Sequence, residues 1–176
     1  HVISRERQDA FAVESHRRAA QAQADGRFDE QIVGVPVKVK RETVDFLKDE
    51  HIRPDADAAS MARLAPVFRK AGGTVTAGNA SGMNDAGAAV VLMDEARAAE
   101  LGAPIRGRIL SYASCGVDPD IMGIGPVPAV RRALDRAGVT LDQVGVIELN
   151  EAFAAQALAV IKDLDLDPAK VNPNGG

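Results

Sequence analysis

The sequence predicts an α/β fold, in which strands and helices alternate along the chain. Residues 88–93 and 144–149 are apolar runs with the length of buried strands, and residues 105–113 alternate in polarity as a strand does. The segments that follow residues 113 and 149 carry apolar residues at helical spacing. Strand, helix and strand in this order are typical of parallel units joined by right-handed crossovers.

The composition is that of a globular protein and argues against several classes of function. Of the 176 residues, 46% are hydrophobic and 26% are charged, which is ordinary for a folded domain. The net charge of −4 and the lack of a basic run interleaved with aromatic residues argue against a nucleic-acid partner. The longest apolar stretch, residues 86–93, is too short to span a bilayer, so we expect no membrane insertion. A single cysteine, Cys115, excludes an internal disulfide framework and fits a reducing cytoplasm.

The first segment is predicted to be a helix. Ser4 is a favourable N-cap, and the residues to about Ala24 are rich in alanine, arginine, glutamine and glutamate before Gly26 ends the pattern. Residues 32–39 then predict a strand, because they are β-branched and alternate loosely, and Pro36 indicates a sheet edge.

The following segments are predicted to be a loop, a short helix and a second loop. Residues 41–58 are mixed and charged, which indicates an irregular loop. Apolar residues then follow at helical spacing, and Pro66 limits the regularity of the helix that they predict. These residues are Met61, Leu64, Ala65 and Phe68. Residues 74–85 are small, polar and contain glycine, as in a loop that a ligand or another backbone approaches closely. A plain tight turn is the alternative interpretation of this segment.

The strand at residues 88–93 leads to a short helix that Asp94 caps and that ends at Gly102. Residues 103–104 form a candidate domain boundary, and residues 116–128 are a connection rich in glycine and proline. A helix closed by Gly138 follows, with an apolar stripe at Val130, Ala133, Leu134 and Ala137.

The last part of the chain carries the strongest candidate for chemistry. After the strand at residues 144–149, a helix presents one apolar face at Phe153, Ala157, Val160, Ile161 and Leu164, and Val171 begins a further strand. Asn150 stands at the carboxyl end of the strand, where open α/β sheets bind ligands. Its amide can both donate and accept, so it can hold a water or polarise a carbonyl. A helix cap is the alternative interpretation of Asn150.

Other chemistry-bearing residues indicate no site. His1, His16 and His51 are isolated, and Cys115 has no partner at metal-ligand spacing, so we predict no metal site. Cys115 has no histidine at a suggestive position and lies among small residues, which favours a structural thiol.

Five blocks of sequence resemble the thiolase family in order and spacing, and they are distributed from one end of the chain to the other. They are residues 3–12 (ISRERQDAFA), 74–82 (TVTAGNASG), 116–126 (GVDPDIMGIGP), 150–157 (NEAFAAQA) and 171–176 (VNPNGG). The resemblance implies a partial thiolase fold, in which two similar βαβαβαββ halves carry a loop domain. It assigns residues 1–83 to the loop domain and the return to the N-terminal half, residues 84–104 to the end of that half, and residues 105–176 to the start of the C-terminal half.

The resemblance implies an acyl-CoA acyltransferase that performs Claisen condensation of acyl-CoA with acetyl-CoA, or the reverse thiolysis of a 3-ketoacyl-CoA. In this family a cysteine is acylated, a histidine activates it and a second cysteine shuttles the proton. We expect all three to lie outside these residues, because the chain starts at a helix and stops within the last block. The 176 residues alone are therefore expected to be inactive and to fold poorly.

The resemblance also implies roles for eight residues. Asn150 matches the asparagine that holds an oxyanion-hole water, and Met122 and Phe153 match residues that line the acyl and pantetheine channel. Residues at positions that contact CoA are Arg53, Ser60, Phe68, Ala77 and Ser81. The extra residue within residues 71–73 shifts Phe68 relative to Thr74, which departs from the family pattern. No cofactor is implied beyond CoA thioesters as substrates.

Two further function classes remain open. One is a non-catalytic CoA- or lipid-binding relative, and the other is a generic α/β nucleotide-binding module. The complete motif around Asn150 favours the enzyme, because binding alone does not require an oxyanion donor. The family implies a homodimer or homotetramer, whereas the sequence specifies neither the acyl-chain length nor the direction of the reaction.

Overall fold

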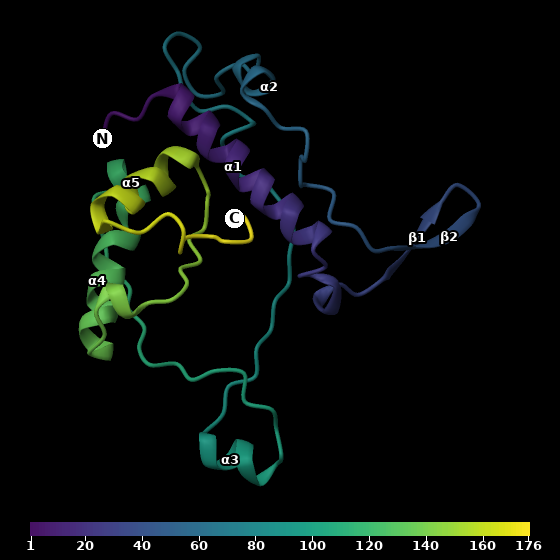
Figure 1. Cartoon of the computed structure of the whole chain (residues 1–176), viewed down its shortest axis with the longest axis vertical. Coiled ribbons are helices and arrows are strands. Elements are labelled where there is room, and N and C mark those ends of the chain that lie inside the picture. Colours follow the sequence, from purple (N-terminus) through teal and green to yellow (C-terminus); the bar gives the residue numbers. More distant parts are fainter. The chain divides into compact units, whose positions relative to one another are not determined.

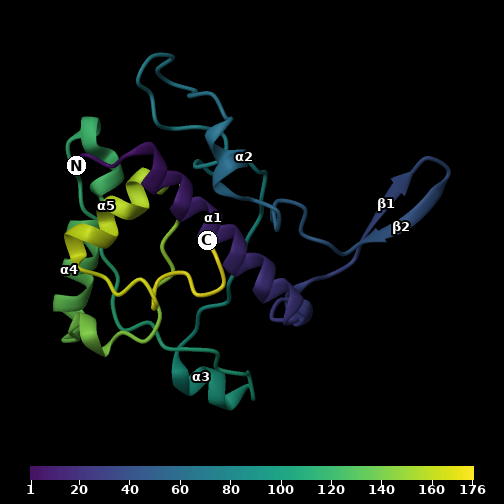
Figure 2. The same ribbon diagram turned by 45° about the horizontal axis from the view of Figure 1, so that its top comes forward.

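The computed structural model describes all 176 residues, which form two compact units. Unit 1 comprises residues 1–82 and 144–176, and unit 2 comprises residues 83–143. Figure 1 shows the elements along the chain, and Figure 2 gives a second view of the same ribbon. No helix has the length and apolar character needed to cross a membrane.

Unit 1 is built around the long first helix, α1 (Arg5–Ala24). The Ser4 hydroxyl accepts a hydrogen bond from the Arg7 N–H, and Gly26 follows the helix with a φ of +71°, so the predicted helix is confirmed at both ends. A short 3-10 turn, η1 (Asp29–Gln31), comes next. Helix α1 packs against α5 (Ala154–Leu164). Both helices bury small side chains within unit 1, which are Ala12, Ala22, Ala154, Ala157 and Ala159.

A two-stranded antiparallel hairpin replaces part of the predicted loop. Strands β1 (Val35–Val39) and β2 (Glu42–Phe46) pair with Val37 opposite Val44, and Lys40 takes a φ of +57° in the turn. The strand predicted at residues 32–39 is thus confirmed in part. The loop predicted at residues 41–58 is wrong for β2, because the pairing with β1 makes a strand of residues that show no clear alternation by themselves.

Helix α2 (Ala58–Ala62) lies earlier than the apolar spacing predicted. A capping box begins it, in which the Asp57 carboxylate accepts from the Ser60 N–H and the Ser60 hydroxyl accepts from the Asp57 N–H. The helix ends before Pro66, which cannot donate the next helical hydrogen bond. The predicted continuation to Phe68 is therefore wrong.

Unit 2 confirms the predicted helices. Asp94 caps α3 (Glu95–Glu100), and Gly138 ends α4 (Pro126–Ala137) with a φ of +63°. A 3-10 segment, η2 (Pro119–Ile124), precedes α4.

The strands predicted at residues 88–93 and 105–113 do not form. A strand requires a neighbour for its backbone hydrogen bonds, and the only sheet in the structure is the hairpin of β1 and β2. Their apolar side chains are exposed instead, as at Val91 (84%) and Leu110 (67%).

The strand predicted at residues 144–149 is reduced to one parallel bridge between Ile147 and Val171. Helix α5 lies between these two residues in the sequence, so the bridge keeps the order strand, helix, strand that the pattern predicts.

We predict that amide hydrogen exchange rates in the isolated 176-residue chain differ strongly between its segments. Residues 88–93 and 105–113 should exchange at nearly the rate of an unfolded peptide, because they have no strand partner and their apolar side chains are exposed. Helix α4 in the same unit should be protected, which makes it the internal control. Protection of residues 88–93 equal to that of α4 would contradict the structure.

Candidate functional site

Two of the sequence blocks lie side by side in unit 1. The backbone N–H of Ser81 donates to the carbonyl of Ala152 at 3.0 Å, and the N–H of Ala154 donates to the carbonyl of Asn79 at 2.9 Å. Ala80 and Phe153 thereby form an antiparallel bridge. The turn at residues 74–82 and the segment that contains Asn150 therefore form one local structure, although about 70 residues separate them in the sequence.

Asn150 does not cap the helix that follows it. The N-cap of α5 is Phe153, three residues later, and no side chain bonds to this helix end. Asn150 is exposed, and its amide makes no hydrogen bond within the chain. The helix-cap interpretation is therefore wrong, and the amide is free to donate to a ligand or a water.

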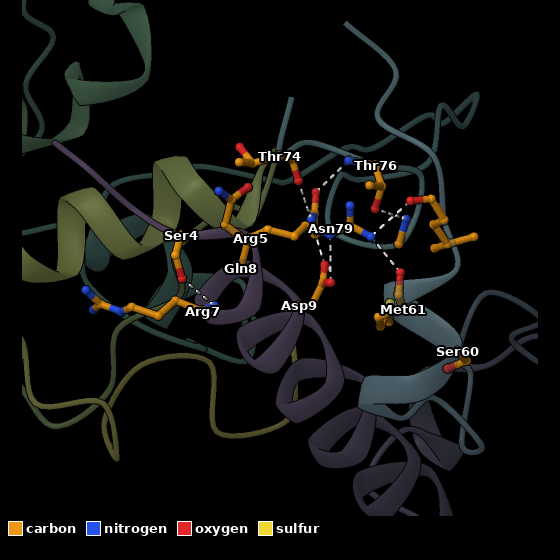
Figure 3. Close-up of polar contacts among 12 residues, drawn as sticks. Ser4, Arg5, Arg7, Gln8, Asp9, Ser60, Met61, Thr74, Thr76 and Asn79 are labelled. Carbon is orange, nitrogen blue, oxygen red and sulfur yellow. Dashed lines mark hydrogen bonds and ion pairs between the residues drawn. The ribbon is translucent and has the colours of Figure 1, made fainter. Parts of the chain in front are cut away.

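The buried side chain of Asn79, 2% exposed, holds the turn in its shape. Its Oδ1 accepts from the Thr76 N–H at 2.8 Å, and its Nδ2 donates to the Asp9 carboxylate at 2.8 Å and to the Thr74 carbonyl at 3.0 Å. Thr76 is fully buried, and its hydroxyl oxygen accepts from the Gly78 N–H. Figure 3 shows this cluster at the N-terminal end of α1. The polar groups of the turn are thus bonded from within and from α1.

Arg5 extends the network to α2. Its Nε donates to Asp9 Oδ2 at 2.7 Å, while Nη2 donates to the carbonyls of Met61 at 2.6 Å and Leu64 at 3.0 Å, just beyond the end of α2 (Figure 3). One guanidinium therefore satisfies carbonyls at a helix end and neutralises the mostly buried carboxylate of Asp9.

Gly78 lies in close contact with side chains of α2 and of the residues that follow it. A Cβ at this position would collide with the side chains of Met61 and Leu64, so the turn lies directly on the residues of α2 and its C-terminal extension. The close approach that the glycine content suggested is, at Gly78, an approach of side chains from the same chain.

Two aromatic rings meet beside the paired segments. The rings of Phe68 and Phe153 lie edge to face, with centroids 6.1 Å apart and planes inclined at 66°. Phe68 is otherwise 74% exposed. The extra residue at 71–73 therefore leaves Phe68 in contact with the segment that contains Asn150.

The other residues predicted to contact CoA differ in their exposure and in their hydrogen bonds. Ala77 and Ser81 are exposed on the turn. The Ser60 hydroxyl donates to the Asp57 carbonyl at 2.8 Å, so its proton is used within the capping box. Arg53 has an exposed side chain, and its backbone N–H donates to Nδ1 of His16 at 3.2 Å.

Met122 and Cys115 belong to unit 2. Met122 lies in η2 with its side chain 75% exposed. Cys115 is half-buried, and unit 2 contains no histidine that could activate its thiol. Nowhere in the structure do three or more metal-ligating side chains gather as a metal site would require.

His16 is isolated from other chemistry-bearing residues in the sequence, but in the structure its side chain is half-buried. Burial is the largest cause that lowers its pKa below 6.5, and the Arg53 guanidinium acts in the same direction, whereas Glu151 and Asp55 oppose them. The Arg53 N–H donates to His16 Nδ1, so this nitrogen must be unprotonated for the bond to exist. His16 therefore couples the Arg53 segment to α1 in its neutral form.

Unit 1 contains a cavity of about 360 Å³. It is lined by residues of α1, α5 and the C-terminal segment, among them Phe11, Leu158, Ile161 and Val171. None of the eight predicted site residues lines it. Glu151 and Asn172 also line it, so the cavity adjoins the segment that contains Asn150.

The sequence alone does not single out Asp9 or Asn79, although both lie inside blocks that resemble the family. The available signal was a carboxylate on the helix that begins the first block and an amide within a run of small residues. Neither feature indicates burial, which depends on contacts between distant segments.

Known proteins resemble this chain over nearly its whole length. The family model described as "Thiolase, N-terminal domain" matches residues 1–96, and "Thiolase, C-terminal domain" matches residues 103–176. The chain is 58% identical over 173 residues to the beta-ketothiolase BktB of Cupriavidus necator, covering 98% of this chain and 44% of that protein. It is 54% identical over 174 residues to an acetyl-CoA acetyltransferase of Shinella zoogloeoides, covering 99% and 44% of the two chains.

Solved structures give the same result. The acetyl-CoA acetyltransferase of Bacillus anthracis superposes with a TM-score of 0.93 at 52% identity, covering 99% of this chain and 44% of that one. Human mitochondrial 3-ketoacyl-CoA thiolase in complex with CoA superposes with a TM-score of 0.85 at 42% identity, covering 99% and 43%. The chain thus spans less than half the length of the relatives that it matches.

We predict that Asn79→Ala destabilises the protein expressed from its complete coding sequence. The change leaves the Thr76 N–H and one oxygen of Asp9 without their partner in a buried setting, at a cost of about 1–3 kcal/mol for each such group. The midpoint of denaturant unfolding measures the effect. The matched control is Gln21→Ala, which removes an exposed amide–carboxylate bond to Asp25 and should shift the free energy of unfolding by less than about 0.5 kcal/mol. Equal effects of the two changes would refute the role of Asn79.

We predict that His16 titrates with a midpoint below 6.5 when its ring protons are followed by NMR. Since the folded state holds this proton less tightly than the unfolded chain, His16 contributes stability that is fully present above pH 6.5. That contribution is lost as the pH falls from 6.5 through the lowered pKa. Arg53→Gln should raise the midpoint, because it removes a positive charge and keeps the backbone N–H donor. A midpoint above 6.5 in the unaltered protein would be incompatible with this setting.

Proposed function

The chain belongs to the thiolase family, and from this premise we propose that it carries part of the active site of an acyl-CoA acyltransferase. The reaction is the Claisen condensation of acyl-CoA with acetyl-CoA, or the reverse thiolysis of a 3-ketoacyl-CoA. The observation that carries this proposal is the backbone pairing of residues 79–81 with residues 152–154. It brings the turn proposed to bind CoA beside the segment that presents Asn150.

In the proposed mechanism the Asn150 amide stabilises negative charge. Its N–H groups donate, through a bound water, to the thioester oxygen of the nucleophilic acyl-CoA as the carbon–carbon bond forms or breaks. The exposed and otherwise unbonded amide supports this role, because it need not give up a protein hydrogen bond. An oriented donor of this kind lowers a barrier by about 2.7–4 kcal/mol.

CoA is proposed to lie along the turn. The small side chains of Ala77 and Ser81 let its pantetheine arm approach the backbone, and Phe68 and Phe153 provide an apolar wall. The exposed Arg53 guanidinium offers positive charge to the anionic nucleotide. Ser60 can contribute as an acceptor, since its proton is bonded to the Asp57 carbonyl. Met122 is a proposed contact of the acyl chain.

We propose that the nucleophilic cysteine and the activating histidine are not among these 176 residues. The curated relatives are more than twice as long as the matched segment, and Cys115 lacks a histidine in its own unit.

The proposed domains divide at residues 83 and 104, and the second division is supported by family models that end at residue 96 and begin at residue 103. We further propose a cytoplasmic homodimer or homotetramer that uses CoA thioesters as substrates and no other cofactor.

A non-catalytic CoA- or lipid-binding protein of the same family is the second candidate. Such a protein would keep the turn and the aromatic wall but would not need the amide of Asn150. The complete motif at residues 150–157 favours the enzyme.

We predict that Asn150→Ala lowers kcat for thiolysis of a 3-ketoacyl-CoA by about 100- to 1,000-fold while KM for CoA changes little. The amide acts on charge that develops in the transition state, so its loss affects turnover more than binding. The assay uses the protein expressed from its complete coding sequence. Asp165→Asn, at the exposed end of α5, is the control and should keep full activity.

An unaltered kcat in Asn150→Ala would contradict the oxyanion role. Stoichiometric binding of CoA by the unsubstituted protein, without any turnover of 3-ketoacyl-CoA substrates, would instead establish the non-catalytic candidate.

A further inference from the structure

The backbone ladder beside Asn150 ends abruptly. The Ile147 N–H donates to the Lys170 carbonyl at 2.9 Å, and the Asn172 N–H donates to the Ile147 carbonyl at 2.9 Å, as in a parallel pair. Asn172 then takes a φ of +46°, which turns the chain away, and the next residue is Pro173. In a regular parallel pair the Leu149 N–H would next donate to the Asn172 carbonyl. The turn at Asn172 directs this carbonyl to the Gly175 N–H instead, so the ladder does not continue to Leu149 through the backbone.

The side chain of Asn172 takes the place of the missing backbone. Its Oδ1 accepts from the Leu149 N–H at 2.7 Å, and its Nδ2 donates to the Leu149 carbonyl at 2.8 Å. The same Nδ2 donates to the carboxylate of Glu151 at 2.6 Å. The carboxamide of asparagine has the donor and acceptor of a peptide group, so it can complete the pairing of one further residue. Asn172 is 2% exposed, which protects these bonds from water.

We propose that Asn172 is a positioning residue for Asn150, a role that rests on the proposed function of Asn150. Asn172 binds the two residues on either side of Asn150 and leaves Asn150 itself unbonded. Fixing both neighbours restricts the backbone of Asn150, and so limits the directions in which its amide can point.

Helix α1 holds Asn172 in place. Nη1 of Arg18 donates to the Val171 carbonyl at 2.7 Å and to the Asn172 carbonyl at 3.3 Å, and the Gly175 N–H also donates to the Asn172 carbonyl. The residue that restrains Asn150 is therefore itself tied to the longest helix of unit 1.

Asparagine is well suited to this position. A positive φ favours glycine, asparagine and aspartate. Glycine would keep the turn but lose the three bonds, and aspartate would face the Leu149 carbonyl and the Glu151 carboxylate with an acceptor. These two substitutions keep the backbone conformation and test the side chain alone.

The experiment measures thiolysis kinetics of Asn172→Gly and Asn172→Asp in the protein expressed from its complete coding sequence. We expect kcat to fall by about a hundredfold, with KM for CoA within about threefold, because the displaced amide acts in the transition state. The matched control is Lys170→Met, which removes a bond from the Lys170 ammonium to the Val144 carbonyl at the end of the ladder away from Asn150. It should keep kcat within about twofold.

The decisive readout is a double-mutant cycle with Asn150→Ala. If Asn172 acts through Asn150, then Asn172→Gly should cost less than about threefold in kcat once Asn150 is already alanine. Equal losses in both backgrounds would overturn the proposal, as would a kcat of Asn172→Gly equal to that of the unsubstituted protein. A full kcat in Asn150→Ala itself would instead refute the proposed function, so the two failures are distinguishable.

Discussion

The hydrogen bonds of the Asn79 side chain are the interactions on which the site depends. This side chain is buried where the turn of residues 74–82 meets α1. The backbone carbonyl of Asn79 accepts a hydrogen bond from the Ala154 N–H at the start of α5. Through Asp9 and Arg5 the same network reaches the carbonyls of Met61, in the last turn of α2, and of Leu64, just after it. Three elements that are distant in sequence are therefore fixed to one another by a few fully bonded polar groups. Because a buried polar group is costly when unpaired, each bond in this network restrains its neighbours.

Two buried asparagines, Asn79 and Asn172, have the same structural role in unit 1. Asn79 holds a tight turn and Asn172 completes a ladder that the backbone abandons at a positive φ. In each case a carboxamide substitutes for a peptide group where regular structure stops. Asn150, in contrast, is exposed and its amide is unbonded. A rigid support around one free amide is the arrangement that electrostatic catalysis requires, since the donor need not reorganise as charge develops.

The parts of this fold that could be predicted from the sequence are those set by local chemistry. Ser4, Asp94 and Gly138 mark helix ends through bonds within one turn, so their helices were predicted closely. The strands expected at residues 88–93 and 105–113 do not form, because a strand depends on a partner for its backbone hydrogen bonds and local sequence does not specify that partner. The α/β class and the family are confirmed by the solved thiolase structures and the family models. The position of Asn150 after an apolar run and the resemblance both single it out, whereas the burial of Asp9, Asn79 and Asn172 arises from contacts between distant segments.

The central claim is that the Asn150 amide and the turn at residues 77–81 face the same bound CoA thioester. A crystal structure of the protein expressed from its complete coding sequence, with a CoA thioester bound, measures this directly. The account predicts that Asn150 Nδ2 lies about 3 Å from the thioester oxygen or from a water that bridges to it, with the pantetheine arm along Ala77 and Ser81. A thioester bound away from this turn, with the Asn150 amide directed into bulk solvent, would contradict the account.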